Sequence, residues 1–339
     1  MIKEPWFWRD SSLTARAVST LLSPLGGLYN FSQKIIWNRA NSFQATIPVI
    51  CVGNASLGGV GKTPFAMMLA ADYLNNQQQR PHFLTRGHGG TITEPVRFDP
   101  QTHQISDAGD EAFLLARHAP VWIARNRAFG AKCAAGAGAT SIIMDDGFQN
   151  PSLAKSFSFL LVDNSDPEGN GRIFPAGPMR EPLTQAADRA DAIIAVKKSN
   201  AEPTHQAITQ ITTNTPLICA WLSPDTEELP DKVIAFCGIG NPQRFFDMLE
   251  NYGTKVVARY GFPDHHRYSA AELDRLRKQA KKLGAPLMTT EKDFVRLQKE
   301  DREDISFLPV KMSVDDPEML KKLLATFIET SDNNESSVR

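Results

Sequence analysis

Residues 48–63 read PVICVGNASLGGVGKT, and this stretch decides the fold. An apolar run typical of a buried strand comes first, and a Gly-rich turn that opens a helix follows it. In that setting, backbone N–H groups and the positive helix end bind phosphate oxygens, Lys62 reaches the β- and γ-phosphates, and the Thr63 hydroxyl can bind Mg²⁺. The predicted nucleotide-binding positions are Ser56, Leu57, Gly58, Gly59, Val60, Gly61, Lys62 and Thr63.

This loop departs from the common pattern G-x-x-x-x-G-K-[ST] at its first position, which is Ser56 instead of glycine. The glycines stand at Gly58 and Gly59, as in the GGxGKT loops of one P-loop subgroup, although Leu57 replaces the extra lysine typical of those loops. A Gly-rich turn without a ligand is the alternative. The strand before the loop and the helix after it favour nucleotide binding.

A second apolar strand ends in the acidic turn DDGFQ at residues 145–149. Such a turn is typical of the Walker B element, which places a carboxylate near Mg²⁺ or its waters. Asp145 is the predicted metal ligand, Asp146 is its alternative, and Gln149 can also reach the metal. The guanine-reading pattern NKxD is missing, because TEKD at residues 290–293 has the wrong residue before its lysine. ATP is therefore favoured over GTP.

Short apolar runs alternate with helical patterns from Ile47 onward, which predicts an α/β fold with a mostly parallel sheet covered by helices. The expected strands are Pro48–Val52, His82–Thr85, Val121–Ala124, Ser141–Asp145, Phe157–Val162, Ala192–Val196, Leu217–Trp221, Lys232–Cys237, Lys255–Tyr260, Pro286–Thr289 and Ile305–Val310. The expected helices include Lys62–Asn75, Glu111–Arg117, Asn126–Ala135, Gln243–Asn251, Ala270–Leu283 and Pro317–Ile328.

A stretch rich in Pro and Thr, 212–230, suggests a domain boundary. We expect four parts: an N-terminal helical segment at 1–43, a P-loop core at 44–215, a second α/β lobe at 216–330 and a disordered tail at 331–339.

The composition is that of an ordinary folded protein of 339 residues, with 42% hydrophobic and 22% charged residues. The net charge of -1 gives no global basic field for nucleic acid. No signal peptide is expected at the N-terminus, and the four cysteines lack metal-type spacing, which indicates reduced core residues.

The first 43 residues are aromatic and basic, with WFW at 6–8, five basic residues and two acidic ones. Apolar residues at helical spacing run from Leu13 to Ile35, and Pro24 with the following glycines should kink or break that helix. Such a face can lie in a membrane interface or pack on the protein's own core. The segment is too short and too polar to span a bilayer comfortably.

Several polar motifs follow predicted strand ends, where open α/β sheets bind ligands. They are RGHGG (86–90), GDE (109–111), GNGRIFPAGPMREP (169–182), DHHRY (264–268) and TTEKD (289–293). Together with VGNASLGGVGKTP (52–64) and DDGFQ (145–149), they resemble the tetraacyldisaccharide 4'-kinase family, the lipid A 4'-kinases. The resemblance extends from the aromatic N-terminus to about Thr330.

The resemblance implies an enzyme that transfers the γ-phosphate of ATP, with Mg²⁺, to the 4'-hydroxyl of a tetraacyldisaccharide 1-phosphate, forming lipid IVA in lipid A biosynthesis. It also implies two α/β/α lobes and an N-terminal helical segment that contacts the membrane. A peripheral location at the cytoplasmic face of the bacterial inner membrane follows, without an obligate protein partner. A P-loop switch or chaperone NTPase is the competing interpretation of the loop alone.

The resemblance also assigns roles. Asp110 matches the family's base, and His265 matches the partner of that base, although the choice between His265 and His266 stays open. The alternative role of Asp110 is the N-cap of the following helix, and the alternative for either histidine is a structural residue of a turn. Glu111 would join Thr63, Asp145 and Gln149 around Mg²⁺. The predicted substrate residues are Arg86, Asn170, Arg172 and Arg180. For Arg172 and Arg180, the alternative role is a structural ion pair with Glu181.

Overall fold

The apolar run before the Gly-rich loop forms a fully buried strand, β1 (Val49–Asn54), inside a large sheet. The computed structural model describes residues 4–75, 79–199, 201–212 and 215–325. In spatial order the large sheet contains β13 (Val310–Val314), β8 (Leu217–Pro224), β7 (Ala192–Lys197), β6 (Phe157–Asp163), β1, β5 (Ser141–Asp145), β2 (Pro81–Thr85), β4 (Val121–Ile123) and β3 (Val96–Arg97). β1 pairs in parallel with β5 and β6, so the loop after β1 and the acidic turn after β5 meet at one edge.

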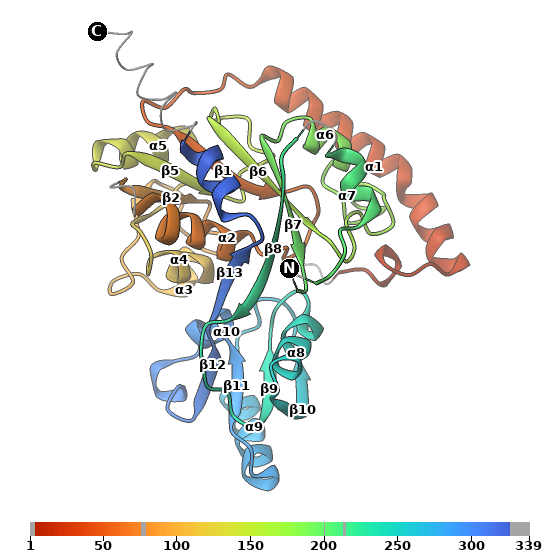
Figure 1. The fold of residues 1–339 in the computed structure, drawn as a ribbon, viewed down its shortest axis with the longest axis vertical. Coiled ribbons are helices and arrows are strands. Elements are labelled where there is room, and N and C mark those ends of the chain that lie inside the picture. Colours follow the sequence, from red (N-terminus) through yellow and green to blue (C-terminus); the bar gives the residue numbers. More distant parts are fainter. Residues whose placement is uncertain (1–3, 76–78, 200, 213–214, 326–339) are drawn as a thin grey trace. The chain divides into compact units, whose positions relative to one another are not determined.

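Short helices connect these strands (Figure 1). They are α2 (Lys62–Met68) with its π-helical continuation η2 (Leu69–Leu74), α3 (Ile105–Ala108), α4 (Asp110–Leu115), α5 (Arg127–Gly136), α6 (Leu183–Ala187) and α7 (Gln206–Ile211). Residues 317–325 are also helical. The core between helices and sheet consists mainly of Ala, Leu, Ile, Val and Met side chains, as expected for strands that are buried on both faces.

A second, four-stranded sheet is formed by β10 (Lys255–Gly261), β9 (Lys232–Cys237), β11 (Leu287–Thr290) and β12 (Ile305–Leu308), in that spatial order and all parallel. Its helices are α8 (Pro242–Asn251), α9 (Ala270–Leu283), α10 (Glu291–Arg296) and the 3₁₀ turn η4 (Lys299–Asp301). Apolar clusters pack on each of its faces, so this sheet has a core of its own.

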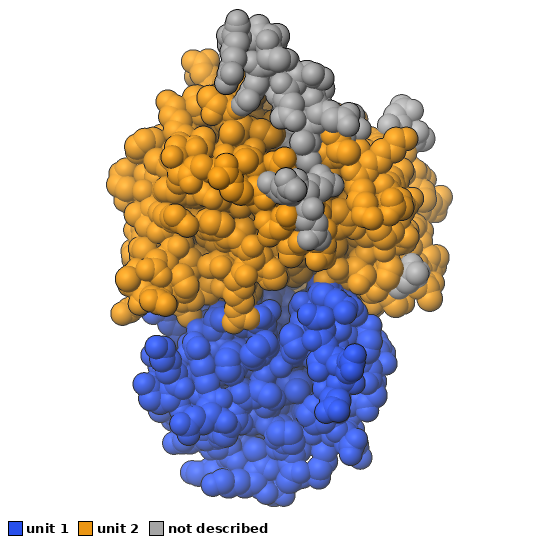
Figure 2. All heavy atoms as spheres, turned by 60° about the vertical axis from the view of Figure 1, so that its left-hand side comes forward, with its two compact units in different colours: residues 1–4, 222–311 blue, residues 5–221, 312–339 orange. Residues whose placement is uncertain are grey.

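The chain divides into two compact units (Figure 2). Residues 222–311 form one unit, and residues 5–221 with the described chain from 312 onward form the other. This differs from the expected second lobe at 216–330, because β13 returns to the large sheet beside β8, where Asp315 accepts a hydrogen bond from the Cys219 N–H at 2.8 Å. The expected tail at 331–339 and the last residues of the expected helix Pro317–Ile328 lie outside the described residues.

The N-terminal segment begins with a 3₁₀ turn, η1 (Trp6–Trp8), and continues as one long helix, α1 (Leu13–Arg39), shown in Figure 1. The helix begins at Ser12, whose side chain accepts a hydrogen bond from the Ala15 N–H. It runs on through Pro24, so of the expected kink or break the break was wrong, and the kink stays a prediction. Tertiary contacts outweigh the missing N–H, because Arg172 donates to the Ser19 carbonyl and to side chains in the turn before the proline.

Every expected strand is present, with ends that shift by a few residues. Ile305–Val310 was expected as one strand, but Pro309 separates β12 in the small sheet from β13 in the large one. The expected helix Lys62–Asn75 is α-helical only to Met68 and π-helical beyond it. β3, α3, α6, α7 and α10 were not expected.

Candidate active site

The Gly-rich loop connects β1 to α2, and Gly61 is the residue that caps the helix. Lys62, the first residue of α2, donates to the Asn54 side-chain oxygen at 3.0 Å and lies 3.5 Å from Asp146. Asn54 is the last residue of β1 and is fully buried. The lysine is therefore held at the mouth of the loop, where the predicted phosphate contacts require it.

Thr63 and Asp145 lie together, as the sequence predicts for a Mg²⁺ site. The Thr63 hydroxyl donates to Asp145 Oδ2 at 3.0 Å. The other carboxylate oxygen of Asp145 is buried and has no hydrogen-bond partner among the described residues. Burial and the neighbouring charge of Glu111 raise the pKa of Asp145 to about 7, although Lys62 opposes the shift.

This donor set fits a magnesium ion. Mg²⁺ is bound in kinases through one or two carboxylates, a hydroxyl, waters and substrate phosphates, so a cage of protein ligands is not needed. Accordingly, no group of three or more His, Cys, Asp and Glu side chains suited to a metal is found in the described part of the chain. Such a cation would bind the buried oxygen of Asp145 that has no hydrogen-bond partner among the described residues, beside the Thr63 hydroxyl.

The next residue, Asp146, is held by two cations. Arg180 lies 3.0 Å from its carboxylate, and Lys62 lies on the same carboxylate. Burial alone would raise the pKa of Asp146, but these two cations outweigh it and hold the pKa well below its usual range. Asp146 is thus ionised throughout the physiological range and fixes the position of Lys62 and Arg180.

Gln149, a predicted metal ligand, is occupied by protein contacts. Its amide nitrogen donates to the Asn54 carbonyl at 2.7 Å and to Glu181 at 2.9 Å. Its oxygen accepts a hydrogen bond from Arg180 at 3.1 Å. These contacts favour a role in bracing the acidic turn, since a cation next to the Arg180 guanidinium would be repelled, and metal binding by Gln149 stays a prediction.

Asp110 and Glu111 begin α4, the former only 2% exposed. The N-cap residue is Gly109 and no side chain caps this helix, so the N-cap alternative for Asp110 was wrong. Gly109 has φ 78°, and a Cβ there would lie 2.3 Å from the His88 carbonyl oxygen. The glycines of RGHGG and GDE therefore allow two loops to pack backbone to backbone, which fixes where α4 starts. Glu111 lies near enough to Asp145 to raise its pKa.

Arg127, which sequence analysis did not select, is a buried cation of this site. It is 3% exposed and donates to the Ala124 carbonyl. Burial, with the neighbouring Arg86, lowers the pKa of Arg127 to about 10, while both aspartates of the acidic turn raise it. Arg86 itself is exposed, as a substrate-facing residue would be. The only sequence signal for Arg127 was its place just after a strand end.

The long motif at 169–182 has two structural roles. In its first half, the Asn170 amide donates to the carbonyls of Phe7 and Ala176 and to the Ser19 hydroxyl, and Arg172 donates to α1 as described above. In its second half, Met179 pairs with Ser56, and the Arg180 N–H donates to the Ala55 carbonyl. Asn170 and Arg172 thus hold the N-terminal helix, and substrate binding by them stays a prediction.

The predicted ion pair of Glu181 with Arg172 or Arg180 is not what the structure shows. Glu181 binds Arg189 instead, with both carboxylate oxygens within 2.8 Å of its guanidinium.

In the unit of residues 222–311, His265 and His266 have different environments. Arg296 donates to Nδ1 of His265 at 3.1 Å, and because arginine is only a donor, the proton of a neutral His265 sits on Nε2. His266 stacks on Phe262 and pairs with Glu272 at 3.2 Å. His265 is therefore held as a hydrogen-bond donor, whereas His266 serves local packing.

The TTEKD motif anchors this histidine turn. Asp293 is fully buried and pairs with Arg296 at 2.8 Å. It also accepts hydrogen bonds from the Gly238 N–H, the Tyr268 hydroxyl and the Thr290 hydroxyl. The motif is structural, since its aspartate joins α10, the end of β9 and the DHHRY turn.

The predicted apolar face of α1 points outward. Leu21 is 79% and Leu28 is 64% exposed, while the packed face consists of Ala15, Ser19 and Gly26. Packing of the apolar face on the protein's own core was therefore the wrong alternative. Among the described residues, no helix is long and apolar enough to cross a membrane.

A mostly parallel sheet, a Gly-rich loop with Lys62 and Thr63, and an acidic strand end with an orphaned carboxylate oxygen define a P-loop phosphotransferase. The family model "Tetraacyldisaccharide-1-P 4'-kinase" matches residues 18–329. The chain belongs to this family of kinases.

Individual relatives agree with this assignment. The tetraacyldisaccharide 4'-kinase of Rhodospirillum centenum is 41% identical over 98% of this chain and 99% of its own length. That of Paramagnetospirillum magneticum is 42% identical over 95% and 98%. Among solved structures, an "apo" form LpxK from Aquifex aeolicus in complex with ATP covers 92% of this chain and 99% of its own, with 29% identity and a TM-score of 0.72. The expected α/β kinase fold is thereby confirmed.

Proposed function

We propose that this kinase transfers the γ-phosphate of ATP to the 4'-hydroxyl of a tetraacyldisaccharide 1-phosphate, forming lipid IVA. The observation that carries the proposal is the joint position of Lys62, Thr63 and Asp145 beside the acidic start of α4. ATP as donor is supported by the solved relative that holds it and by the lack of an NKxD motif. Bound Mg²⁺ would neutralise phosphate charge, with Thr63 and Asp145 as its protein contacts.

Different side chains of the site have different proposed roles in phosphate transfer. Lys62 is positioned to contact the transferred phosphate, and Arg127 with Arg86 adds positive charge where negative charge develops. Asp110 is the proposed base that accepts the proton of the sugar hydroxyl, because it is a buried carboxylate at the start of α4, next to Glu111. His265, held with its Nε2 proton, keeps the role of a partner in this proton transfer as a prediction.

The acceptor is a lipid, and the outward apolar face of α1 supports work at a membrane surface. Leu21, Leu25 and Leu28 would enter the lipid interface while Arg16 and Lys34 of the same helix remain at head-group level. We infer a peripheral location at the cytoplasmic face of the bacterial inner membrane, where ATP and the lipid precursor meet. An obligate protein partner is not required by this arrangement.

The test is transfer of γ-labelled phosphate from Mg-ATP to tetraacyldisaccharide 1-phosphate in detergent micelles. Asp110→Asn should lower kcat at least about a hundredfold while ATP affinity is kept, because the fold and the phosphate contacts remain. Lys62→Ala should lose transfer as well. Asp107→Asn, a carboxylate of the same turn that caps α3, is the matched control and should retain most activity.

The outcomes separate the alternatives. Normal transfer by Asp110→Asn would remove its role as base and leave the kinase assignment in place. If the wild type hydrolyses ATP but labels no lipid, and a protein partner stimulates hydrolysis, the competing switch NTPase would be favoured.

A further inference from the structure

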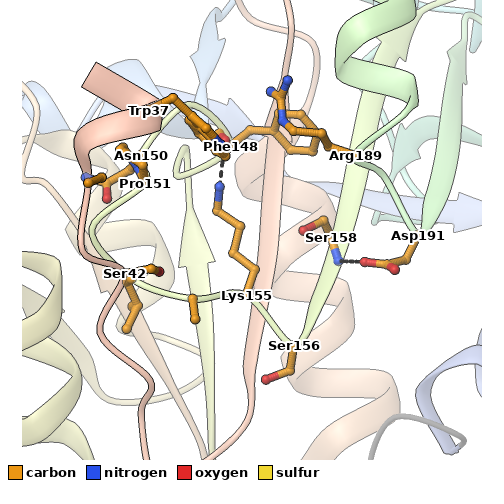
Figure 3. Close-up of a pocket in the computed structure, with 13 residues that line it drawn as sticks. Trp37, Ser42, Phe148, Asn150, Pro151, Lys155, Ser156, Ser158, Arg189 and Asp191 are labelled. Atoms are coloured by element: carbon orange, nitrogen blue, oxygen red, sulfur yellow. Dashed lines mark hydrogen bonds between the residues drawn. The ribbon is translucent and has the colours of Figure 1, made fainter. Parts of the chain in front are cut away.

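A cavity of about 460 Å³ lies at the edge of the large sheet where its strands begin (Figure 3). Ser156 and Ser158 at the start of β6, and Asp191 just before β7, form one side of it. Trp37 at the end of α1 and Ser42 after that helix form the other. The Gly-rich loop follows the carboxyl end of β1, whereas this cavity opens where β6 and β7 begin, and Phe148 of the acidic turn is the lining residue that connects the two.

Two cations and two aromatic rings form the wall of the cavity. Lys155 Nζ lies 4.9 Å from the centre of the Trp37 ring and donates to the Phe148 carbonyl at 2.6 Å. The Arg189 guanidinium lies 4.7 Å from the same Trp37 ring and 5.3 Å from Phe148. Figure 3 shows both cations converging on these rings. The wall thus carries two cationic side chains at the end of the helix proposed to lie on the membrane.

Lys155 makes no direct ion pair among the described residues, although the charge of Glu181 acts on it and raises its pKa. Arg189 has Glu181 as its partner, but no carboxylate lies within ion-pair distance of Lys155 in the part of the chain that the structure describes. Burial lowers the pKa of Lys155, so its ammonium group is partly stripped of water. A partly desolvated cation attracts an anion more strongly than an exposed one. An anion that enters the cavity would form a direct ion pair with Lys155.

One acidic side chain, Asp191, also lines the cavity, and its negative charge opposes the binding of an anion. Asp191 accepts a hydrogen bond from the Ser158 N–H at 2.8 Å. Figure 3 shows its carboxylate directed to Ser158. Glu181 already pairs with Arg189, so Lys155 is the cation of the lining that has no ion-pair partner among the described residues.

We propose that this cavity binds a phosphate group, as inorganic phosphate or as the phosphate of an anionic lipid head group. The volume leaves room for a phosphate with a small organic substituent. Trp37 belongs to an aromatic type enriched at membrane interfaces, and the exposed apolar residues Phe31 and Ile36 precede it on α1. A lipid whose chains contact α1 would therefore present its head group at the level of the cavity. This proposal does not rest on the proposed catalytic function.

The first experiment measures inorganic phosphate binding by calorimetry on the full chain, with the Gly-rich loop saturated by Mg²⁺ and a non-hydrolysable ATP analogue. Lys155→Gln keeps a donor for the Phe148 carbonyl but removes the charge, and it should weaken phosphate binding at least about tenfold, whereas Lys155→Arg should restore it. Lys132→Gln is the matched control, because Lys132 also lies over a ring, that of Phe43, but outside the cavity. It should change binding by less than about twofold.

Ser42→Asp provides a second variant that does not threaten folding, since Ser42 is exposed. It brings a negative charge to the lining and should also weaken phosphate binding. The two sources of phosphate are then separated by binding to phosphatidylcholine vesicles with and without phosphatidylglycerol. Loss of the preference for phosphatidylglycerol in Lys155→Gln and Ser42→Asp identifies the head group, even if free phosphate binds weakly. Loss of phosphate binding with an unchanged preference identifies the free ion.

Two results would overturn the proposal. In one, wild type binds no phosphate and neither variant changes the vesicle preference. In the other, phosphate binds equally to wild type, Lys155→Gln and Ser42→Asp. In either case Lys155 would serve only to fasten the end of α1 to the core, and Lys155→Gln would lower the melting temperature alone. The kinase assay is unaffected by these outcomes, so failure of this proposal is distinct from failure of the proposed function.

Discussion

Replacing three outward leucines of α1 should weaken membrane binding without unfolding the protein. The change is Leu21→Gln, Leu25→Gln and Leu28→Gln together. Glutamine keeps a high helix propensity, so the helix itself should persist. The side chains on the packed face, Ala15 and Ser19, are untouched.

The size of the effect follows from the exposed fractions of 79%, 52% and 64% for these leucines. Full burial of one leucine contributes about 1.5–3 kcal/mol, so the exposed surface of all three corresponds to ~4 kcal/mol. An interfacial helix inserts only part of that surface, which leaves ~2 kcal/mol. At about 1.4 kcal/mol per factor of ten, the partition coefficient should fall on the order of thirtyfold.

The assay is co-sedimentation with lipid vesicles, combined with thermal unfolding. The free energy of unfolding should change by less than about 0.5 kcal/mol, since exposed side chains contribute little to the core. Leu283→Gln, at a partly exposed leucine of α9, is the control and should bind vesicles like the wild type. If the triple variant sediments with vesicles as well as the wild type does, the outward face of α1 is not the membrane contact.

Three further predictions concern the interior. Gly26→Ala should destabilise the docking of α1 by about 1–3 kcal/mol, because its Cβ would lie 2.7 Å from the Ile173 carbonyl oxygen. A Cβ at Gly27 meets open space, so Gly27→Ala should stabilise the protein by up to about 1 kcal/mol. Urea unfolding and proteolysis of α1 check both predictions. The pKa of Asp145 is raised to about 7, so its folding contribution is fully present below pH 3.8 and is lost as pH rises through about 7. Without nucleotide, Asp145→Asn should therefore raise the melting temperature more at pH 8 than at pH 5; an equal shift at both would contradict the shifted pKa. Asp293→Ala should cost about 3–5 kcal/mol in urea unfolding, because it leaves a buried arginine without its partner, and a loss below about 1 kcal/mol would argue against the anchor role.

The parallel sheet was predictable because strands buried on both faces are continuous apolar runs. Ser141–Asp145 was predicted to the residue, and the loop after β1 followed from its glycines and lysine. Local pattern does not say which sheet a strand joins, so the two strands on either side of Pro309 were predicted as one. Strands as short as Val96–Arg97 carry no periodicity at all.

The sequence predicts those site residues whose role follows from motif spacing. It does not predict those whose role depends on burial in the folded protein. Lys62, Thr63 and Asp145 follow from their places at strand and helix ends. Arg127 was missed because an arginine after a strand looks exposed until the fold buries it. The proline in α1 suggested a break for a related reason. Its cost is local and visible in sequence, while the contacts that outweigh it come from Arg172, which is 149–153 residues away from its partners along the chain.

The loop at 169–182 changes how mutations in this family member should be interpreted. Its first half holds α1 through Asn170 and Arg172, and its second half pairs with the Gly-rich loop at Ser56. The helix α1 and the nucleotide loop therefore share one support. A loss of activity on changing Arg172 does not by itself identify a substrate ligand, because release of α1 and displacement of the loop would lower activity too. Only an effect on the affinity for the lipid that persists with α1 still docked, as judged by proteolysis, would assign Arg172 to the substrate.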